Sequence, residues 1–238
     1  MILSCSNISR SFGDNHILKR VSFHIEEHEK AAVVGINGAG KSTFARCLCG
    51  LDKRALGELE LNGHSYRAKQ RCHISYMVMQ DVNHQLFTED VLDELLLSMD
   101  GEDEKENTEW ANQILSSLDL AAKIKLHPMS LSGGEKQRVA IGSAIASNKE
   151  ILVFDEPTSG LDYFHMVEVS DNLNRLKDMG KSLFLITHDP ELIYKCCTYL
   201  LFIQENKVLW HRPMDDEAIK LLRAFFSHEK GANIINAS

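Results

Sequence analysis

Short apolar runs separated by turn residues fill the first third of the chain. Most of them contain β-branched residues or alternate with polar residues, which is the pattern of β-strands. The predicted strands are Ile2–Ile8, Ile17–Ile25, Ala31–Val34, Glu58–Leu61 and Ile74–Val78. Between the third and the fourth of them, a glycine-rich turn precedes helix-favouring residues from Lys41 to Leu51. We therefore predict a strand, a loop and a helix in direct succession.

Helical spacing replaces this pattern from Thr88 to about Met129. Two apolar sets each fall on one face of a predicted helix, namely Val91, Leu92, Leu95 and Leu96, and Ile114, Leu115 and Leu118. The acidic run 101–107 between them is expected to be a solvated connection. The segment therefore predicts a small helical subdomain.

Beyond this segment, strands alternate with helices again. Ile151–Phe154 and Ser182–Thr187 have the composition of buried parallel strands, and the pattern between them predicts a helix from about Tyr163 to Met179. We predict an antiparallel strand pair at a sheet edge, formed by Tyr199–Ile203 and Lys207–Trp210. A closing amphipathic helix is predicted at Met214–Phe226. The last ten residues are expected to be frayed.

The composition limits the class of protein. Of the 238 residues, 44% are hydrophobic and 25% are charged, which is close to the average of soluble globular proteins. The longest apolar run, Cys196–Ile203, is far shorter than the ~20 residues of a membrane-spanning helix. The N-terminus also lacks the shape of a secretory signal. We therefore expect a chain that crosses no membrane and stays where it is made.

Charge and cysteine usage argue against two further kinds of site. The net charge is −8 and the basic residues are scattered, whereas a nucleic-acid partner would require a basic stripe. The six cysteines form no CxxC pair of the kind that binds zinc. We expect no nucleic-acid partner, and we interpret the cysteines as reduced packing residues.

The segment from Gly35 to Ser42 matches the phosphate-binding pattern GxxxxGK[ST] between a predicted strand and a predicted helix. Glycines let backbone N–H groups turn toward phosphate oxygens, and the helix N-terminus favours the same anion. Lys41 would contact the β- and γ-phosphates, and Ser42 would bind Mg²⁺. A plain glycine-rich turn is the alternative. The predicted phosphate contacts are Asn37, Gly38, Ala39, Gly40, Lys41, Ser42 and Thr43.

Two adjacent carboxylates, Asp155 and Glu156, end the predicted strand Ile151–Phe154. Neighbouring residues at a strand end point in different directions, so the two groups can take separate roles. Asp155 would bind Mg²⁺, and Glu156 would polarise an attacking water molecule. Taken alone, this could be any strand that runs into an acidic turn.

The segment Leu131–Arg138 opens another predicted helix, which continues to Ala146. A serine followed by small residues at a helix start is a second candidate anion site. Two such sites beside one predicted Mg²⁺ site suggest that the second serves a nucleotide held by another copy of the protein.

These motifs together carry a resemblance to a known family. The stretch LSGGEKQR from Leu131 to Arg138 resembles the signature motif of ABC ATPases, and the order of elements is similar over nearly the whole chain. The resemblance implies an α/β fold with a P-loop NTPase core at 1–87 and 131–228, built on a mostly parallel sheet. It also implies an N-terminal antiparallel β subdomain, an inserted α-helical subdomain at 88–130 and a C-terminal tail at 229–238.

The resemblance gives roles to residues that the motifs alone leave undecided. Gln80 would sense Mg²⁺ and the γ-phosphate, His188 would hydrogen-bond the γ-phosphate, and Asp162 would lie along a dimer seam. Phe12 would stack on adenine. Without the family, Gln80 and His188 would be ordinary strand-end residues and Phe12 a core aromatic.

The resemblance further implies a head-to-tail dimer, homomeric or with a related ATPase subunit, that sandwiches two ATP molecules. Each γ-phosphate would contact Lys41 and His188 of one subunit and Ser132 and Gly134 of the other. Separate transmembrane subunits would be the partners, and the chain would lie peripherally at the cytoplasmic face of the cell membrane.

The stretch from Asp81 to Glu94 is similar to energy-coupling-factor importers of vitamins, cobalt or nickel. In it, Leu86 and Phe87 would either dock a membrane partner or belong to the core. The chain departs from that group in a shorter helical subdomain and in Glu135, where glutamine is common. A soluble ABC ATPase that remodels protein partners, as in iron–sulfur assembly, is the alternative function. A regulator without turnover is disfavoured because Glu156 is present.

Overall fold

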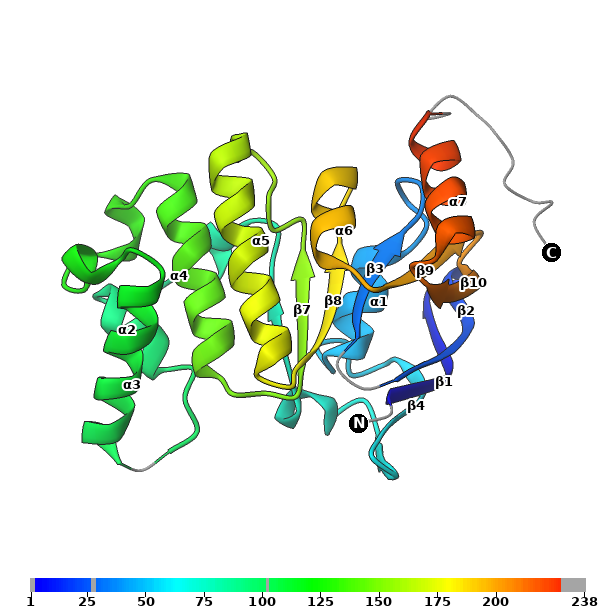
Figure 1. Ribbon diagram of the computed structural model, residues 1–238. Helices are drawn as coiled ribbons and strands as arrows, with labels where there is room; N and C mark the ends of the chain where they lie inside the picture. The colour runs from blue at the N-terminus through cyan, green and yellow to red at the C-terminus, as the bar shows by residue number, and fades with distance from the viewer. Residues whose placement is uncertain (1–2, 27–28, 102, 228–238) are drawn as a thin grey trace.

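The computed structural model describes residues 3–26, 29–101 and 103–227. The frayed tail predicted for the last ten residues lies outside these ranges, as does Ile2. A six-stranded sheet has the order β10-β9-β3-β8-β7-β6, and a four-stranded sheet has the order β2-β1-β4-β5. Figure 1 shows the four-stranded sheet at one end of the molecule and the helices α2 and α3 at the other.

The larger sheet is parallel except at one edge. Strands β6, β7, β8, β3 and β9 pair in parallel, whereas β10 pairs antiparallel with β9. The strands are β3 (Lys30–Val34), β6 (Ser75–Val78), β7 (Ile151–Asp155), β8 (Ser182–Ile186), β9 (Tyr199–Gln204) and β10 (Lys207–Pro213). The predicted mostly parallel sheet with an antiparallel edge pair is therefore confirmed.

The smaller sheet is antiparallel throughout, as the resemblance implied. Its strands are β1 (Leu3–Phe12), β2 (Asn15–Ile25), β4 (Leu56–Leu61) and β5 (His64–Tyr66). The sequence analysis did not identify β5, which is short and mostly exposed and therefore has no apolar pattern.

Helices cover both faces of the larger sheet. On one face, α4 (Gly133–Ala146), α5 (Tyr163–Asp178) and α6 (Pro190–Cys196) run side by side, and α7 (Asp216–Ser227) closes the chain. On the other face, α1 (Lys41–Leu48) lies between the two sheets. Strand β3 divides its side chains between the two cores, since Ala32 and Val34 pack on the first face and Ala31 and Val33 on the second. Burial of both faces makes β3 the fixed centre of the fold.

Helix α1 is shorter than the predicted segment Lys41–Leu51. Gly50 has a φ of 70°, and its N–H donates to the carbonyl oxygen of Cys47. The N–H of Leu51 donates to the carbonyl oxygen of Arg46. This pair of bonds is the Schellman arrangement that ends a helix at a left-handed glycine. The glycine therefore stops the helix before the apolar pattern ends.

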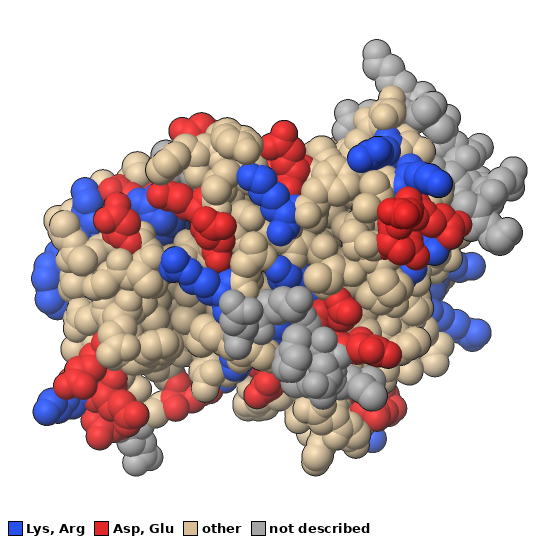
Figure 2. Space-filling model, viewed as in Figure 1, with Lys and Arg blue, Asp and Glu red and all other residues tan. Residues whose placement is uncertain are grey.

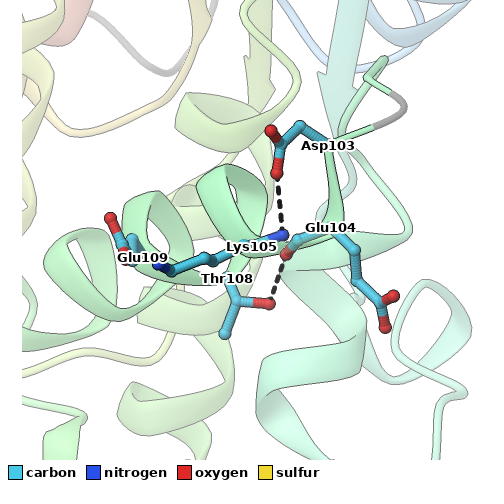
Figure 3. Close-up of a pocket in the computed structure, with 5 residues that line it drawn as sticks. All are labelled: Asp103, Glu104, Lys105, Thr108 and Glu109. Carbon is cyan, nitrogen blue, oxygen red and sulfur yellow. Dashed lines mark hydrogen bonds between the residues drawn. The ribbon is translucent and has the colours of Figure 1, made fainter.

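The span 88–130 contains α2 (Val91–Leu96), α3 (Glu104–Ser117) and two short 3-10 helices, Ala121–Lys123 and Pro128–Ser130. Its apolar faces pack on α4 in the same core as the sheet. The prediction of a solvated connection over 101–107 was wrong from Glu104 onward. The Asp103 carboxylate accepts hydrogen bonds from the backbone N–H groups of Lys105 and Glu106 and so begins α3 earlier. Figure 3 shows this N-terminal turn, where Thr108 donates to the Glu104 carbonyl oxygen.

The cysteines behave as packing residues with one exception. All six are free, and five are buried, whereas Cys72 is exposed. Burial raises the pKa of the Cys5 and Cys49 thiols to about 12, so both stay protonated at neutral pH. The interpretation of Cys72 as a packing residue was therefore wrong.

Two observations concern membranes and surface charge. Within the described ranges, every helix is too short or too polar to cross a bilayer. On the face seen in Figure 2, basic and acidic side chains are interspersed.

A fully buried arginine joins α1 to the smaller sheet. The Arg71 guanidinium donates to the carbonyl oxygens of Cys47 (2.8 Å), Gly57 (2.7 Å) and Tyr66 (3.3 Å). Cys47 lies at the C-terminal end of α1, where carbonyl groups lack helical partners and favour a cation. Arg71 therefore stabilises the position of the phosphate-binding helix against the antiparallel sheet.

We expect Arg71→Leu to lower the free energy of unfolding by about 2–4 kcal/mol, because three carbonyl oxygens lose their hydrogen bonds to a buried guanidinium. Urea unfolding followed by circular dichroism would measure the change. The matched control is Arg67→Leu at an exposed position nearby, which should change the free energy by less than about 0.5 kcal/mol. Equal effects of the two substitutions would contradict the role given to Arg71.

Candidate nucleotide-binding site

The loop between β3 and α1 approaches other backbone segments too closely for side chains at two of its glycines. A Cβ atom at Gly35 would lie 2.1 Å from the carbonyl oxygen of Ile203, and one at Gly40 would lie 2.8 Å from that of Ile17. Gly40 also has a φ of 100°, which only glycine adopts without strain. The loop is therefore held between β9 and β2, and its backbone forms one wall of a cleft.

This cleft has a volume of about 640 Å³. Ten of the predicted site residues line it: Asn37, Gly38, Gly40, Lys41, Ser42, Thr43, Gln80, Asp155, Glu156 and His188. Ile17, Ser159 and Ile186 also line it and were not predicted from the sequence. The ends of β3, β6, β7 and β8 thus bring together motifs that lie far apart along the chain.

Lys41 lies over the loop with its ammonium group at the cleft. Its Nζ donates to the carbonyl oxygens of Gly35 at 2.8 Å and Ile36 at 3.1 Å. Burial lowers its pKa, although Glu156 and Asp155 act in the opposite direction. The carbonyl contacts hold the cation in the loop, from which its flexible stem could reach a phosphate.

Asp155 ends β7 beside the start of α1. Its carboxylate is buried and hydrogen-bonded to Ser42, and burial raises its pKa against the opposing effects of Ser42, Arg46 and Lys41. The described residues contain no group of three or more His, Cys, Asp or Glu side chains able to hold a metal ion. Ser42 and Asp155 nevertheless fit Mg²⁺, which prefers hard oxygen ligands and takes the rest from phosphates and water.

Glu156 has a backbone conformation that is rare for residues other than glycine. Its φ is 51°, and its N–H donates to the carbonyl oxygen of Ile186 at 2.8 Å. Such residues occur where the surrounding structure holds them, often at functional sites. The turn lets the carboxylate enter the cleft rather than continue the line of β7.

Glu156 also contacts His188, which follows β8. The His188 N–H donates to Glu156 Oε2 at 3.3 Å, and His188 Nε2 lies 3.6 Å from Glu156 Oε1. Burial raises the pKa of Glu156, and the contacts with His188 oppose only part of this effect. A carboxylate with a raised pKa can accept a proton from a bound water molecule.

Gln80 reaches the cleft from the loop after β6, and a residue missed by the sequence analysis fixes this loop. Gln85 Oε1 accepts from Met79 N–H at 3.1 Å, and its Nε2 donates to the Met77 carbonyl oxygen and to the Tyr76 hydroxyl, both at 3.2 Å. Gln85 could not be identified from the sequence, because it lies in an irregular loop without a hydrophobic pattern.

Five of the predicted site residues do not line the cleft: Phe12, Ala39, Ser132, Gly134 and Asp162. Phe12 is exposed at the end of β1, and the side chain of Ala39, within the loop, is buried. Ser132 is the N-cap of α4, and its hydroxyl donates to Glu135 Oε2 at 2.9 Å. Gly134 lies in the first turn of α4, and Asp162 directly precedes α5. The predicted contacts of Ser132 and Gly134 belong to a second copy, so a single chain does not test them.

The chain has relatives among known protein families and curated proteins. The model of the protein family described as "ABC transporter" matches residues 18–159 of the chain. A Treponema denticola protein named as an ABC transporter ATP-binding protein is 41% identical over 204 residues, which are 85% of this chain and 41% of that protein. The chain thus spans about two fifths of the length of this relative. The Bacillus subtilis glutamine transport ATP-binding protein GlnQ is 29% identical, with 95% of this chain and 100% of that protein covered.

Solved structures share the fold. A nucleotide-free ATP-binding cassette from an ABC transporter has a TM-score of 0.83 at 24% identity, with 94% of this chain and 95% of that chain covered. The protein cbiO1 from Clostridium perfringens, part of the ABC transporter complex cbiONQ, has a TM-score of 0.81 at 22% identity, with 96% of this chain and 94% of that chain covered. The family match and the shared architecture show that this chain belongs to the ABC transporter family, as one of its ATP-binding cassettes.

Proposed function

We propose that this chain is the ATP-hydrolysing subunit of a membrane transporter. The observation that carries the proposal is the meeting of Lys41, Ser42, Asp155, Glu156 and His188 in one cleft. These residues supply the groups that phosphoryl transfer to water needs, namely a phosphate cradle, oxygen ligands for a metal ion and a base.

In the proposed reaction, the backbone of the loop 35–40 and Lys41 bind the β- and γ-phosphates of ATP. Ser42 and Asp155 would hold Mg²⁺, which neutralises charge on the phosphate oxygens when it is bound. Glu156 orients a water molecule and accepts its proton as the oxygen attacks the γ-phosphorus and the bond to ADP breaks. His188 contacts the γ-phosphate and holds the Glu156 carboxylate in place.

The proposed working form is a dimer in which each ATP lies between two chains. The N-terminus of α4, with Ser132 and Gly134, would complete the site of the other chain, because helix N–H groups favour an anion. Asp162 would lie along the seam. Whether the second chain is identical or related does not change this scheme.

The proposed membrane contact is the loop that follows Gln80. Leu86 is 1% exposed and belongs to the core, whereas Phe87 is 73% exposed. Glu94 Oε2 accepts hydrogen bonds from the N–H groups of Phe87 and Thr88 and from the Thr88 hydroxyl, at 2.8–3.1 Å. An exposed aromatic whose backbone Glu94 holds, in the loop that follows Gln80, is suited to dock a transmembrane subunit at the cytoplasmic face of the membrane.

We further propose an importer of the energy-coupling-factor type, on the basis of the stretch from Asp81 to Glu94. The relative GlnQ is named for glutamine transport, so an amino-acid importer is a second candidate supported by sequence identity. The soluble protein remodeller is the third candidate. Co-purification from detergent-solubilised membranes separates it from the first two, since only a transporter subunit would recover integral membrane proteins.

We expect Glu156→Gln to retain ATP binding and to lower hydrolysis by at least about 10²-fold, because the amide cannot accept a proton. Phosphate release and calorimetric titration would measure the two properties. With ATP and Mg²⁺ the variant should also form a dimer, seen by light scattering. The control is Glu150→Gln at the other end of β7, which should hydrolyse ATP normally. Hydrolysis at the wild-type rate by Glu156→Gln would refute its role.

We expect Asp155→Asn to raise the free energy of unfolding of the nucleotide-free chain at pH 7.5, by on the order of 1 kcal/mol. The folded pKa of Asp155 is raised, so its ionised form is disfavoured in the fold. This penalty is complete above the folded pKa, shrinks as the pH falls from there toward the ordinary pKa of an aspartate, and is absent below that. The difference between variant and wild type in urea unfolding should therefore shrink on acidification, and Mg²⁺-dependent hydrolysis should be lost at every pH. A stability difference independent of pH would contradict this assignment.

We expect Phe87→Ser to leave the ATPase activity of the isolated chain unchanged and to abolish its recovery with membrane partners. The side chain is exposed, so its loss removes contact area without opening a cavity. Affinity purification from native membranes would measure the recovery. Leu209→Ser, at another exposed apolar position on β10, is the matched control and should retain the partners. Full recovery of membrane partners with Phe87→Ser would exclude this loop as the docking site.

A further inference from the structure

A largely buried ion pair supports the aromatic ring predicted to contact the nucleotide base. The Arg10 guanidinium lies over the ring of Phe12, with Cζ 4.0 Å from the ring centroid. Its Nε donates to the Asp52 carboxylate, and its Nη1 donates to the carbonyl oxygen of Ser11. The side chains of Arg10 and Asp52 are only 10% and 16% exposed. Arg10 is therefore held in place over the ring and is not a freely moving surface side chain.

Asp52 anchors the pair on the C-terminal side of α1. Its N–H donates to the carbonyl oxygen of Arg46, and its Oδ1 accepts from the N–H of Arg54 at 3.1 Å. Burial alone would raise the pKa of Asp52, but the hydrogen bond from Arg10 lowers it below its ordinary value. The carboxylate thus stays ionised at neutral pH and keeps the guanidinium aligned.

The strand that carries Phe12 is in contact with the phosphate-binding loop through its hairpin partner. Phe12 pairs with Asn15 at the turn between β1 and β2, and Ile17 on β2 lines the cleft. The carbonyl oxygen of Ile17 lies so close to Gly40 of the phosphate-binding loop that it leaves no room for a Cβ atom there. Phe12 is 54% exposed although Arg10 covers one face of its ring, so much of the ring outside that face is accessible.

We propose that Arg10 is a positioning residue of the nucleotide site, which holds and polarises the Phe12 ring so that its other face stacks on a purine base. The inference rests on the proposed function and on the adenine contact that the family resemblance implies for Phe12. Two physical effects support it. The cation draws π-electron density toward its own face, which reduces repulsion between the other face and the base. A ring already fixed in orientation also loses less conformational entropy on binding.

The opposite arrangement makes a different prediction. If Arg10 covered the face on which the base stacks, the nucleotide would have to displace it, and removal of Arg10 would strengthen binding. The direction of the change in affinity therefore separates the two arrangements.

The test compares two ligands that share the phosphate cradle. Calorimetric titration would measure binding of ADP, which has a base, and of inorganic pyrophosphate, which has none, both with Mg²⁺. We expect Arg10→Ala to weaken ADP binding by about three- to tenfold and to leave pyrophosphate binding unchanged. Lys19→Ala removes the same charge from the same hairpin and should change neither affinity.

Further variants make each outcome decisive. Phe12→Ala should weaken ADP binding at least as much as Arg10→Ala, and the double variant should be no weaker than Phe12→Ala alone. If Phe12→Ala has no effect, the proposed base contact fails. If Phe12→Ala weakens binding while Arg10→Ala leaves it unchanged or strengthens it, the role of Arg10 fails alone. Should Arg10→Ala not fold, Asp52→Ala releases the guanidinium and carries the same test, with a smaller expected loss.

Discussion

The burial of β3 on both faces is the constraint on which the rest of the molecule depends. Its alternating side chains enter two separate cores, so neither its position nor its direction can change without exposing apolar surface. The chain must then turn at once into α1, in a space limited by the backbones at Ile17 and Ile203. The glycine loop is therefore held between these two backbones at Gly35 and Gly40.

Parallel pairing extends this constraint to the other site residues. Strands β7 and β8 run in register with β3, so the carboxyl ends of all three meet at one edge of the sheet. This geometry places Asp155, Glu156 and His188 together. The arrangement is energetically unfavourable in two respects. Glu156 has a left-handed backbone, and burial disfavours the charged forms of Glu156 and Lys41. Such costs are typical of a site that is organised for its ligand rather than for stability.

The sequence could predict the elements whose patterns are local. Buried strands show as apolar runs, and the phosphate loop shows as a motif between a strand and a helix, so the sheet and one wall of the cleft were predicted from the residues. His188 and Gln80 required the resemblance, because a single polar residue after a strand has no distinctive pattern. The early start of α3 depends on one capping carboxylate, and Gly50 ends α1 inside an apolar segment. Gln85 and Arg10 act through contacts that only the folded chain creates.

The charges that line the cleft explain why a second chain belongs to the proposed site. Within one chain, Lys41 faces the carboxylates of Asp155 and Glu156, so the lining has no excess of positive charge for a triphosphate. Mg²⁺ would offset part of the deficit, and Asp155 would be occupied in binding it. The remaining charge on the γ-phosphate requires further donors without an uncompensated negative charge. The first turn of α4 offers backbone N–H groups, and its one carboxylate, Glu135, is already paired with Lys123 and hydrogen-bonded to Ser132. In the proposed dimer, the γ-phosphate would be bound fully only when another chain closes over it, so closure would depend on the phosphate that hydrolysis removes.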